Sequence, residues 1–209
     1  WDLARKHGGL RILPPFGYAD KRGDGNYHGR MDALAGVYSY LQKIRQDYVV
    51  LAGGDVAVNL PLAEIFQSHL ASGADMTAVC TSKLNSDPRG CDYFTTDENG
   101  FATDVAVNPT TAAGLESLEV YILSKELLLS LVDHCSTHNI SSFSDGVLVS
   151  AVKNLKIRAY QFDGYAARLQ SVAGYFARSM ELLDPVVRAQ LFAADRPIKT
   201  KDQSNPSTY

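Results

Sequence analysis

The sequence predicts an α/β fold built on a mixed, mainly parallel sheet. The main observation is a strand–helix–strand unit, in which continuous apolar runs at 48–52 and 76–80 flank a helical pattern at 61–73. Such runs are typical of strands buried on both faces, and a crossover helix between them indicates parallel strands. The middle of the chain adds a hairpin pattern, which contributes antiparallel strands and makes the predicted sheet a mixed one.

The elements up to residue 80 follow from local patterns. Residues 10–13 read as a strand end stopped by two prolines, and the glycine-rich residues 17–29 read as a loop. Apolar residues then recur every three or four positions over 31–46, which predicts an amphipathic helix. Gly53 and the glycine after it end the next strand, and Pro61 opens the crossover helix.

The later elements are predicted in the same way. The hairpin pairs 92–96 with 101–105 around an Asn99-Gly100 turn. The remaining predictions are strands at 118–123 and 157–162, and helices at 125–135, 144–154, 172–183 and 185–192. Residues 195–209 are polar and contain proline, so they read as a linker.

Composition excludes several classes of protein. The chain has 209 residues, 45% of them hydrophobic, and a formal net charge of -3, which is ordinary for a globular protein. No basic run suggests nucleic-acid binding, and no apolar run spans a bilayer, so we expect neither partner and a cytoplasmic location. The chain begins at Trp1 and reads as a fragment. The three cysteines match no metal or redox spacing and are expected to be buried, reduced thiols.

Asp55 is the first candidate for chemistry. It comes just past the carboxyl end of a predicted central strand, where open α/β sheets collect their ligands. Gly54 lets the backbone approach a substrate closely, and a carboxylate there suits Mg²⁺ or a sugar hydroxyl. The alternative is an aspartate that only caps the following turn.

The loop at 23–30 is the second candidate. It includes Gly29 and enters a helix, and Arg30 with the helix N-terminus would suit a phosphate. The alternative, favoured by the pattern alone, is that Asp32 only interacts with the helix dipole. No nucleophile-elbow motif and no Asp-x-Asp motif occurs in the chain.

Taken together, several segments resemble one family. They match, in order, the family patterns WDL…R…GG…ILPP, Y-x-G-T-A-D-A, Y-V-L-I-L-S-G-D-H and G-A-D-x-T, and an exit segment. In this chain they lie at residues 1–15, 27–33, 48–55 with Asn59, 73–77, and 196–201 with 206–209. The chain therefore resembles bacterial glucose-1-phosphate adenylyltransferase, also called ADP-glucose pyrophosphorylase.

The resemblance implies a nucleotidyltransferase domain with a Rossmann-like mixed sheet over residues 1–194, lacking its N-terminal part. Residues 195–209 would lead toward an absent C-terminal β-helix domain. The implied reaction, in glycogen biosynthesis, converts ATP and glucose 1-phosphate to ADP-glucose and pyrophosphate. Two aspartates would hold Mg²⁺, of which Asp55 is the first. Gly29, Asp32 and Gly54 are counted among the substrate-binding positions.

The departures from the family pattern concern the site itself. Arg168 stands where Y-W-x-D-V-G-T has the second aspartate, and Asn108 replaces the lysine of F-V-E-K-P. The segment around Ser142 has lost the histidine and aspartate of S-S-H-D-F-G, and Glu119 replaces the glycine of G-I-Y. At 4 Å and an effective dielectric constant of about 20, each pair of unit charges interacts by about 4 kcal/mol. An arginine in place of the aspartate turns this attraction for Mg²⁺ into a repulsion. We therefore expect Asn108, Ser142 and Arg168 to form a relic or effector site.

This pattern resembles the D-type companion subunit of the enzyme, which pairs with a catalytic C-type subunit. The first hypothesis is a regulatory subunit with a degraded active site, which assembles with that partner or with itself and binds a sugar-phosphate or nucleotide effector. The alternative hypothesis is a competent nucleotidyltransferase with a rearranged metal site. A metal-dependent glycosyltransferase is disfavoured by the missing Asp-x-Asp motif.

Overall fold

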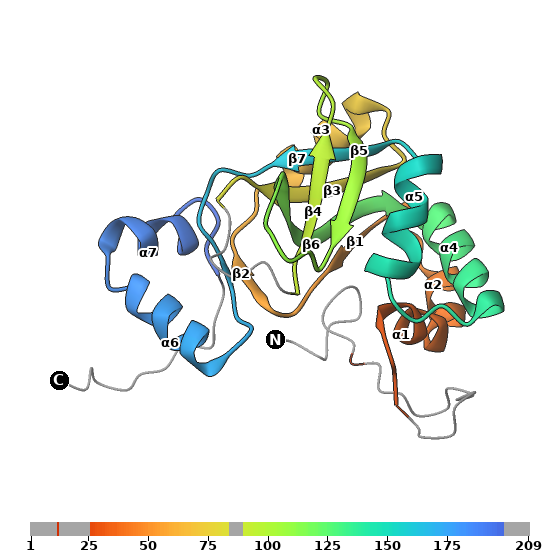
Figure 1. Ribbon diagram of the computed structural model, residues 1–209, viewed down its shortest axis with the longest axis horizontal. Helices are drawn as coiled ribbons and strands as arrows, with labels where there is room; N and C mark the ends of the chain where they lie inside the picture. The colour runs from red at the N-terminus through yellow and green to blue at the C-terminus, as the bar shows by residue number, and fades with distance from the viewer. Residues whose placement is uncertain (1–11, 13–25, 84–89, 199–209) are drawn as a thin grey trace.

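The computed structural model describes residues 12, 26–83 and 90–198 (Figure 1). At its centre is a six-stranded sheet in the order β5-β4-β6-β3-β7, and β1 also pairs with β6. The strands are β1 (Tyr48–Ala52), β3 (Met76–Thr81), β4 (Asp92–Thr96), β5 (Ala102–Val107), β6 (Leu115–Ser124) and β7 (Ile157–Gln161).

The sheet is mixed, as predicted, and the α/β class is confirmed. β6 pairs antiparallel with β1, β3 and β4, whereas β3 and β7 are parallel and β4 and β5 are antiparallel. Hence β1, β3, β4 and β7 run in one direction and β5 and β6 in the other. The strand–helix–strand unit also forms, through α3 (Leu62–Ser72). However, β6 lies between β1 and β3, so most neighbouring pairs are antiparallel.

Alternation along the central strands divides the core into two layers. On one face, Met76, Ala78 and Cys80 of β3 pack under four helices. These are α1 (Arg30–Gly36), α2 (Tyr38–Lys43), α4 (Lys125–His138) and α5 (Val149–Asn154). On the other face, Val79 packs with Ile65 of α3. Because successive side chains of β3 point to opposite faces, α3 lies on the face of the sheet opposite to α4 and α5. All three cysteines are buried and unpaired by disulfides, as predicted.

A second, small sheet and a helical pair complete the fold. β2 (Val56–Val58) pairs antiparallel with β8 (Ala166–Arg168). The chain then enters α6 (Val172–Glu181) and α7 (Pro185–Leu191), which lie to one side of the sheet in Figure 1. The Asn59 side-chain amide donates hydrogen bonds to the carbonyls of Leu191 and Arg196, both at 2.8 Å, and so attaches this helical pair to the body.

Some elements differ from the prediction. The helix expected over 31–46 breaks at Val37, whose φ of -114° and ψ of 16° leave the helical region, and yields α1 and α2. The helix expected over 144–154 begins as a π-helical turn (Ser144–Leu148) before α5. β2 and β8 were not predicted, because three residues are too few to show a periodicity.

Several predictions lie on residues outside the described ranges. These are the strand at 10–13 apart from Ile12, most of the loop at 17–29, and the linker beyond residue 198. Among the described residues, every helix is too short or too polar to cross a bilayer.

Candidate functional site

The small β2–β8 sheet brings Asp55 and Arg168 together. Val56 stands opposite Arg168 in the register, and the Leu169 N–H donates to the Asp55 carbonyl at 2.7 Å. Asp55 comes directly after the two glycines that follow β1. Two residues that are 113 positions apart in the chain are thereby fixed side by side.

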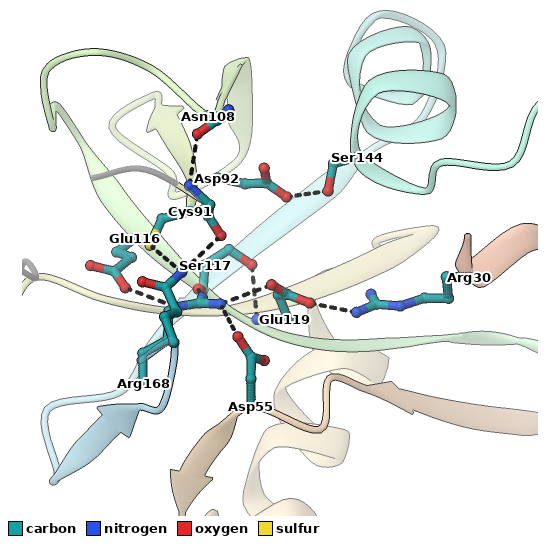
Figure 2. Close-up of polar contacts among 12 residues, drawn as sticks. Arg30, Asp55, Cys91, Asp92, Asn108, Glu116, Ser117, Glu119, Ser144 and Arg168 are labelled. Carbon is teal, nitrogen blue, oxygen red and sulfur yellow. Dashed lines mark hydrogen bonds and ion pairs between the residues drawn. The ribbon is translucent and has the colours of Figure 1, made fainter. Parts of the chain in front are cut away.

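Arg168 is the buried centre of a network of charges (Figure 2). Its Nη1 lies 3.1 Å from Oδ2 of Asp55 and 2.8 Å from Oε1 of Glu119. Its Nη2 donates to the Ser117 carbonyl at 2.7 Å, and its Nε lies 3.5 Å from Oε1 of Glu116. The Arg168 side chain is only 2% exposed. Arg168 is therefore not a surface residue.

The surroundings keep the Arg168 guanidinium charged. Burial alone would lower the pKa of Arg168, but the hydrogen bond to Glu119 and nearby negative charges, including Asp55, raise it above its ordinary value. Glu116 is equally buried, with 2% of its side chain exposed. A buried ion pair of this kind depends on its partners, because either charge alone would be strongly destabilising.

Glu119 links this network to a second arginine. One carboxylate oxygen accepts from Arg168, and the other forms an ion pair with Nη2 of Arg30. Glu119 has a φ of +54°, although it lies inside strand β6, and the pairing with β3 shifts register near this point. Glycine adopts positive φ without penalty, so the glycine in the resembling family pattern suits this backbone better. Glu119 stays in this conformation while its carboxylate holds two guanidinium groups.

Arg30 is positioned by the loop that precedes α5. Its guanidinium carbon lies 5.4 Å from the centre of the Phe143 ring, a cation–π contact. The Met31 N–H donates to the Ser141 carbonyl at 3.0 Å. A Cβ on Gly29 would come within 2.2 Å of that same carbonyl oxygen, so only glycine allows this close packing. The segments predicted at 27–33 and 141–146 are thus in contact.

The other predicted site residues engage partners of their own. Asp32 accepts from the His28 N–H at 3.1 Å, which closes the start of α1. Asn108, with a φ of +48°, accepts from the Gly90 N–H at 2.7 Å. Ser142 hydrogen-bonds the carboxylate of Asp145 at 3.2 Å. Gly54 is exposed, and a Cβ there would meet no atom within 4 Å.

Two members of the network, Glu116 and Ser117, are not among the predicted site residues. Glu116 and Ser117 precede the strand expected at 118–123, and both proved to be buried in a longer strand. The signal was present, because Glu116 and Glu119 put two carboxylates into an otherwise apolar stretch. A buried carboxylate needs a cationic partner, which could have pointed to Arg168.

A cysteine and a hollow lie close to this network. Burial raises the pKa of Cys91 to about 11, although Arg168 opposes the shift, so this thiol is protonated at neutral pH. A mostly apolar hollow of about 370 Å³ lies beside Gly53, between β1, β2 and the start of α3. Among the described residues, no three His, Cys, Asp or Glu side chains are grouped so that they could hold a metal ion.

The comparisons agree with the architecture, which is consistent with a nucleotidyltransferase domain. No protein-family profile matches the chain. Among curated proteins, the chain is similar over its whole length to glucose-1-phosphate adenylyltransferases. It is 28% identical to that of Halalkalibacterium halodurans, covering 55% of that protein, and 26% identical to those of Thermotoga neapolitana and Geobacillus stearothermophilus, covering 50% and 54%. The chain thus spans about half the length of the curated relatives it matches.

Proposed function

We propose that this chain is part of a regulatory subunit of glucose-1-phosphate adenylyltransferase, in which the nucleotidyl-transfer site has lost its metal. The enzyme would make ADP-glucose and pyrophosphate from ATP and glucose 1-phosphate in the cytoplasm. The relatives support this general activity through their names. The loss of the metal is supported by one observation, the ion pair between Arg168 and Asp55 at 3.1 Å.

The donor set around Asp55 does not fit a divalent cation. The carboxylate of Asp55 faces the guanidinium of Arg168, and each oxygen of Glu119 is taken up by an arginine. Mg²⁺ needs near-ideal octahedral oxygen coordination at about 2.0–2.1 Å. A fixed positive charge within hydrogen-bonding distance of Asp55 would repel it. The residues around Asp55 are therefore unsuited to metal-assisted nucleotidyl transfer.

The proposed role requires a partner that is catalytically competent. That partner is a C-type subunit, which would supply the metal-dependent chemistry. A homo-oligomer of this subunit alone fits instead the alternative of a competent nucleotidyltransferase with a rearranged metal site. The region that held substrate in an active relative would then serve as a site for a sugar-phosphate or nucleotide effector. Arg168 and Arg30 support such a role, because guanidinium groups are the preferred partners of phosphate oxygens.

The test is an assay of the whole protein that contains this chain, alone and mixed with its catalytic partner. We expect no Mg²⁺-dependent pyrophosphate release above background from the protein alone, and altered turnover of the partner in the mixture. Strong Mg²⁺-dependent turnover by the protein alone, abolished by Asp55→Asn, would refute the proposal. It would favour instead a competent nucleotidyltransferase with a rearranged metal site.

A further inference from the structure

We infer that Glu119 is an internal anion occupying a two-arginine site for a phosphate group, and that a phosphate-bearing ligand binds there by displacing the Glu119 carboxylate. The inference deepens the proposed function, since it names the residue that controls access to the effector site. It concerns binding alone, so it stands or falls separately from catalysis.

The contacts of Glu119 define the site. Its two carboxylate oxygens are held by different arginines, with Arg168 Nη1 on one and Arg30 Nη2 on the other. The two guanidinium groups are therefore spaced to share a single oxyanion. A phosphate group offers three oxygens at a spacing close to that of a carboxylate, so it can replace both contacts at once.

The two arginines are held in place by other groups. Arg168 is fixed by the Ser117 carbonyl and by Asp55, and Arg30 lies over the ring of Phe143. Neither guanidinium thus depends on Glu119 alone for its position. A site that remains organised when its occupant leaves loses little entropy when a ligand replaces it.

Glu119 is the movable member of the network. Its side chain is 21% exposed, whereas that of Arg168 is 2% exposed, so the carboxylate lies between the buried guanidinium and solvent. Its positive φ is a strained conformation for a residue other than glycine. Asp55 and Glu116 already place two negative charges beside Arg168. A phosphate dianion would be repelled by a third, so it binds only when the Glu119 carboxylate moves away.

The experiment is titration calorimetry with inorganic phosphate and with glucose 1-phosphate on the full chain. We expect Glu119→Gly to bind phosphate at least ten-fold more tightly than the unaltered protein, because the internal competitor is gone and glycine suits the backbone. Tighter binding of glucose 1-phosphate than of phosphate would identify a sugar-phosphate site, and equal binding would identify a site for the phosphate group alone.

Two further variants make the test specific. Arg30→Gln on the Glu119→Gly background should lose the gained affinity, whereas Glu98→Gln, which removes an exposed carboxylate at the β4–β5 turn, should leave affinity at the wild-type level. If Glu119→Gly does not fold, as judged by circular dichroism, Glu119→Gln takes its place. Equal phosphate affinity with and without Glu119, absence of binding in both, or retention of affinity after Arg30→Gln would each overturn the inference.

Discussion

Arg168 carries its charge into a part of the molecule that is nearly closed to water. Buried charges cost several kcal/mol each unless their partners compensate them. Here Glu116 is buried to the same degree, while Asp55 and Glu119 lie closer to solvent. The network is therefore sensitive to the loss of one member and less sensitive to the loss of a matched pair.

The first prediction concerns the stability contributed by this network. Arg168→Met should lower the free energy of unfolding by about 3–5 kcal/mol, because it leaves Glu116 buried without its guanidinium. Adding Glu116→Gln should restore at least about 1 kcal/mol. Urea unfolding at pH 7 measures both values.

An exposed ion pair provides the control for that measurement. Arg178 and Glu181 are paired on α6 with about a third of each side chain exposed. Arg178→Met should therefore cost less than about 1 kcal/mol. A similar cost for Arg168→Met and Arg178→Met would show that the buried network contributes no more than a surface pair.

At the scale of single residues, the sequence predicted part of this site. The resemblance aligned Arg168 with the position of a carboxylate beside Asp55, and the structure brings the two residues into contact. It also marked Glu119 as a departure from glycine. The convergence of Glu119 on two arginines could not be predicted, because it depends on a positive φ within a strand and on the placement of α1.

Strand β6 is the element that organises both the sheet and the site. It pairs with β1, β3 and β4, and its irregular segment carries Glu116, Ser117 and Glu119. The local change of register turns successive side chains away from strict alternation. This irregularity lets one strand supply two carboxylates and a carbonyl to the same guanidinium.

The second prediction follows from the backbone of β6. Glu119→Ala and Glu119→Gly both remove the carboxylate, but only glycine adopts a φ of +54° without strain. Glu119→Ala should therefore be less stable than Glu119→Gly by about 1 kcal/mol in urea unfolding. At Asp133, within helix α4, the order should reverse, because glycine is unfavourable there. Equal stability of the two Glu119 variants would contradict the backbone argument.

The third prediction concerns the contact between α3 and β3. His69 is 3% exposed, and its Nδ1 lies 2.8 Å from Oγ1 of Thr77. Burial lowers the pKa of His69 below its ordinary value of 6.5, and the charge of Asp75 opposes this shift. Because the unfolded chain takes up this proton more readily, His69 supports stability above its unfolded pKa, and this support is lost as pH falls through the folded pKa.

Urea unfolding between pH 8 and pH 5 measures this effect. The free energy of unfolding should fall more steeply below pH 6.5 in the unaltered protein than in His69→Asn, with an excess slope of at most about 1.4 kcal/mol per pH unit. Parallel pH profiles for the two proteins would show that His69 is not the titrating group.

At the scale of elements, long periodic segments were predictable and short ones were not. The pattern of α4 predicted a helix from Lys125, and the structure extends it to His138. β2 and β8 have only three residues each and show no alternation. Their pairing is a tertiary effect, and it could not be read from either segment alone, although it is what places Arg168 beside Asp55.

For the whole molecule, the sequence predicted the mixed α/β class, while the order of strands required the structure. The pattern of two apolar strands joined by a helix predicted that β1 and β3 are parallel, and they are, although β6 separates them. The insertion of β6 between them depends on a strand that begins only at Leu115, 34 residues after β3 ends at Thr81. Local patterns carry no information on such a distant partner.

The attachment of the helical pair has one further consequence. α6 begins four residues after Arg168, and none of the residues of α6 is buried. The pair is joined to the body by β8 and by the clasp of Asn59. Binding of another protein to α6 or α7 would act on β8, the short strand that ends at Arg168. A shift of the helical pair relative to the body would therefore also displace the guanidinium of Arg168.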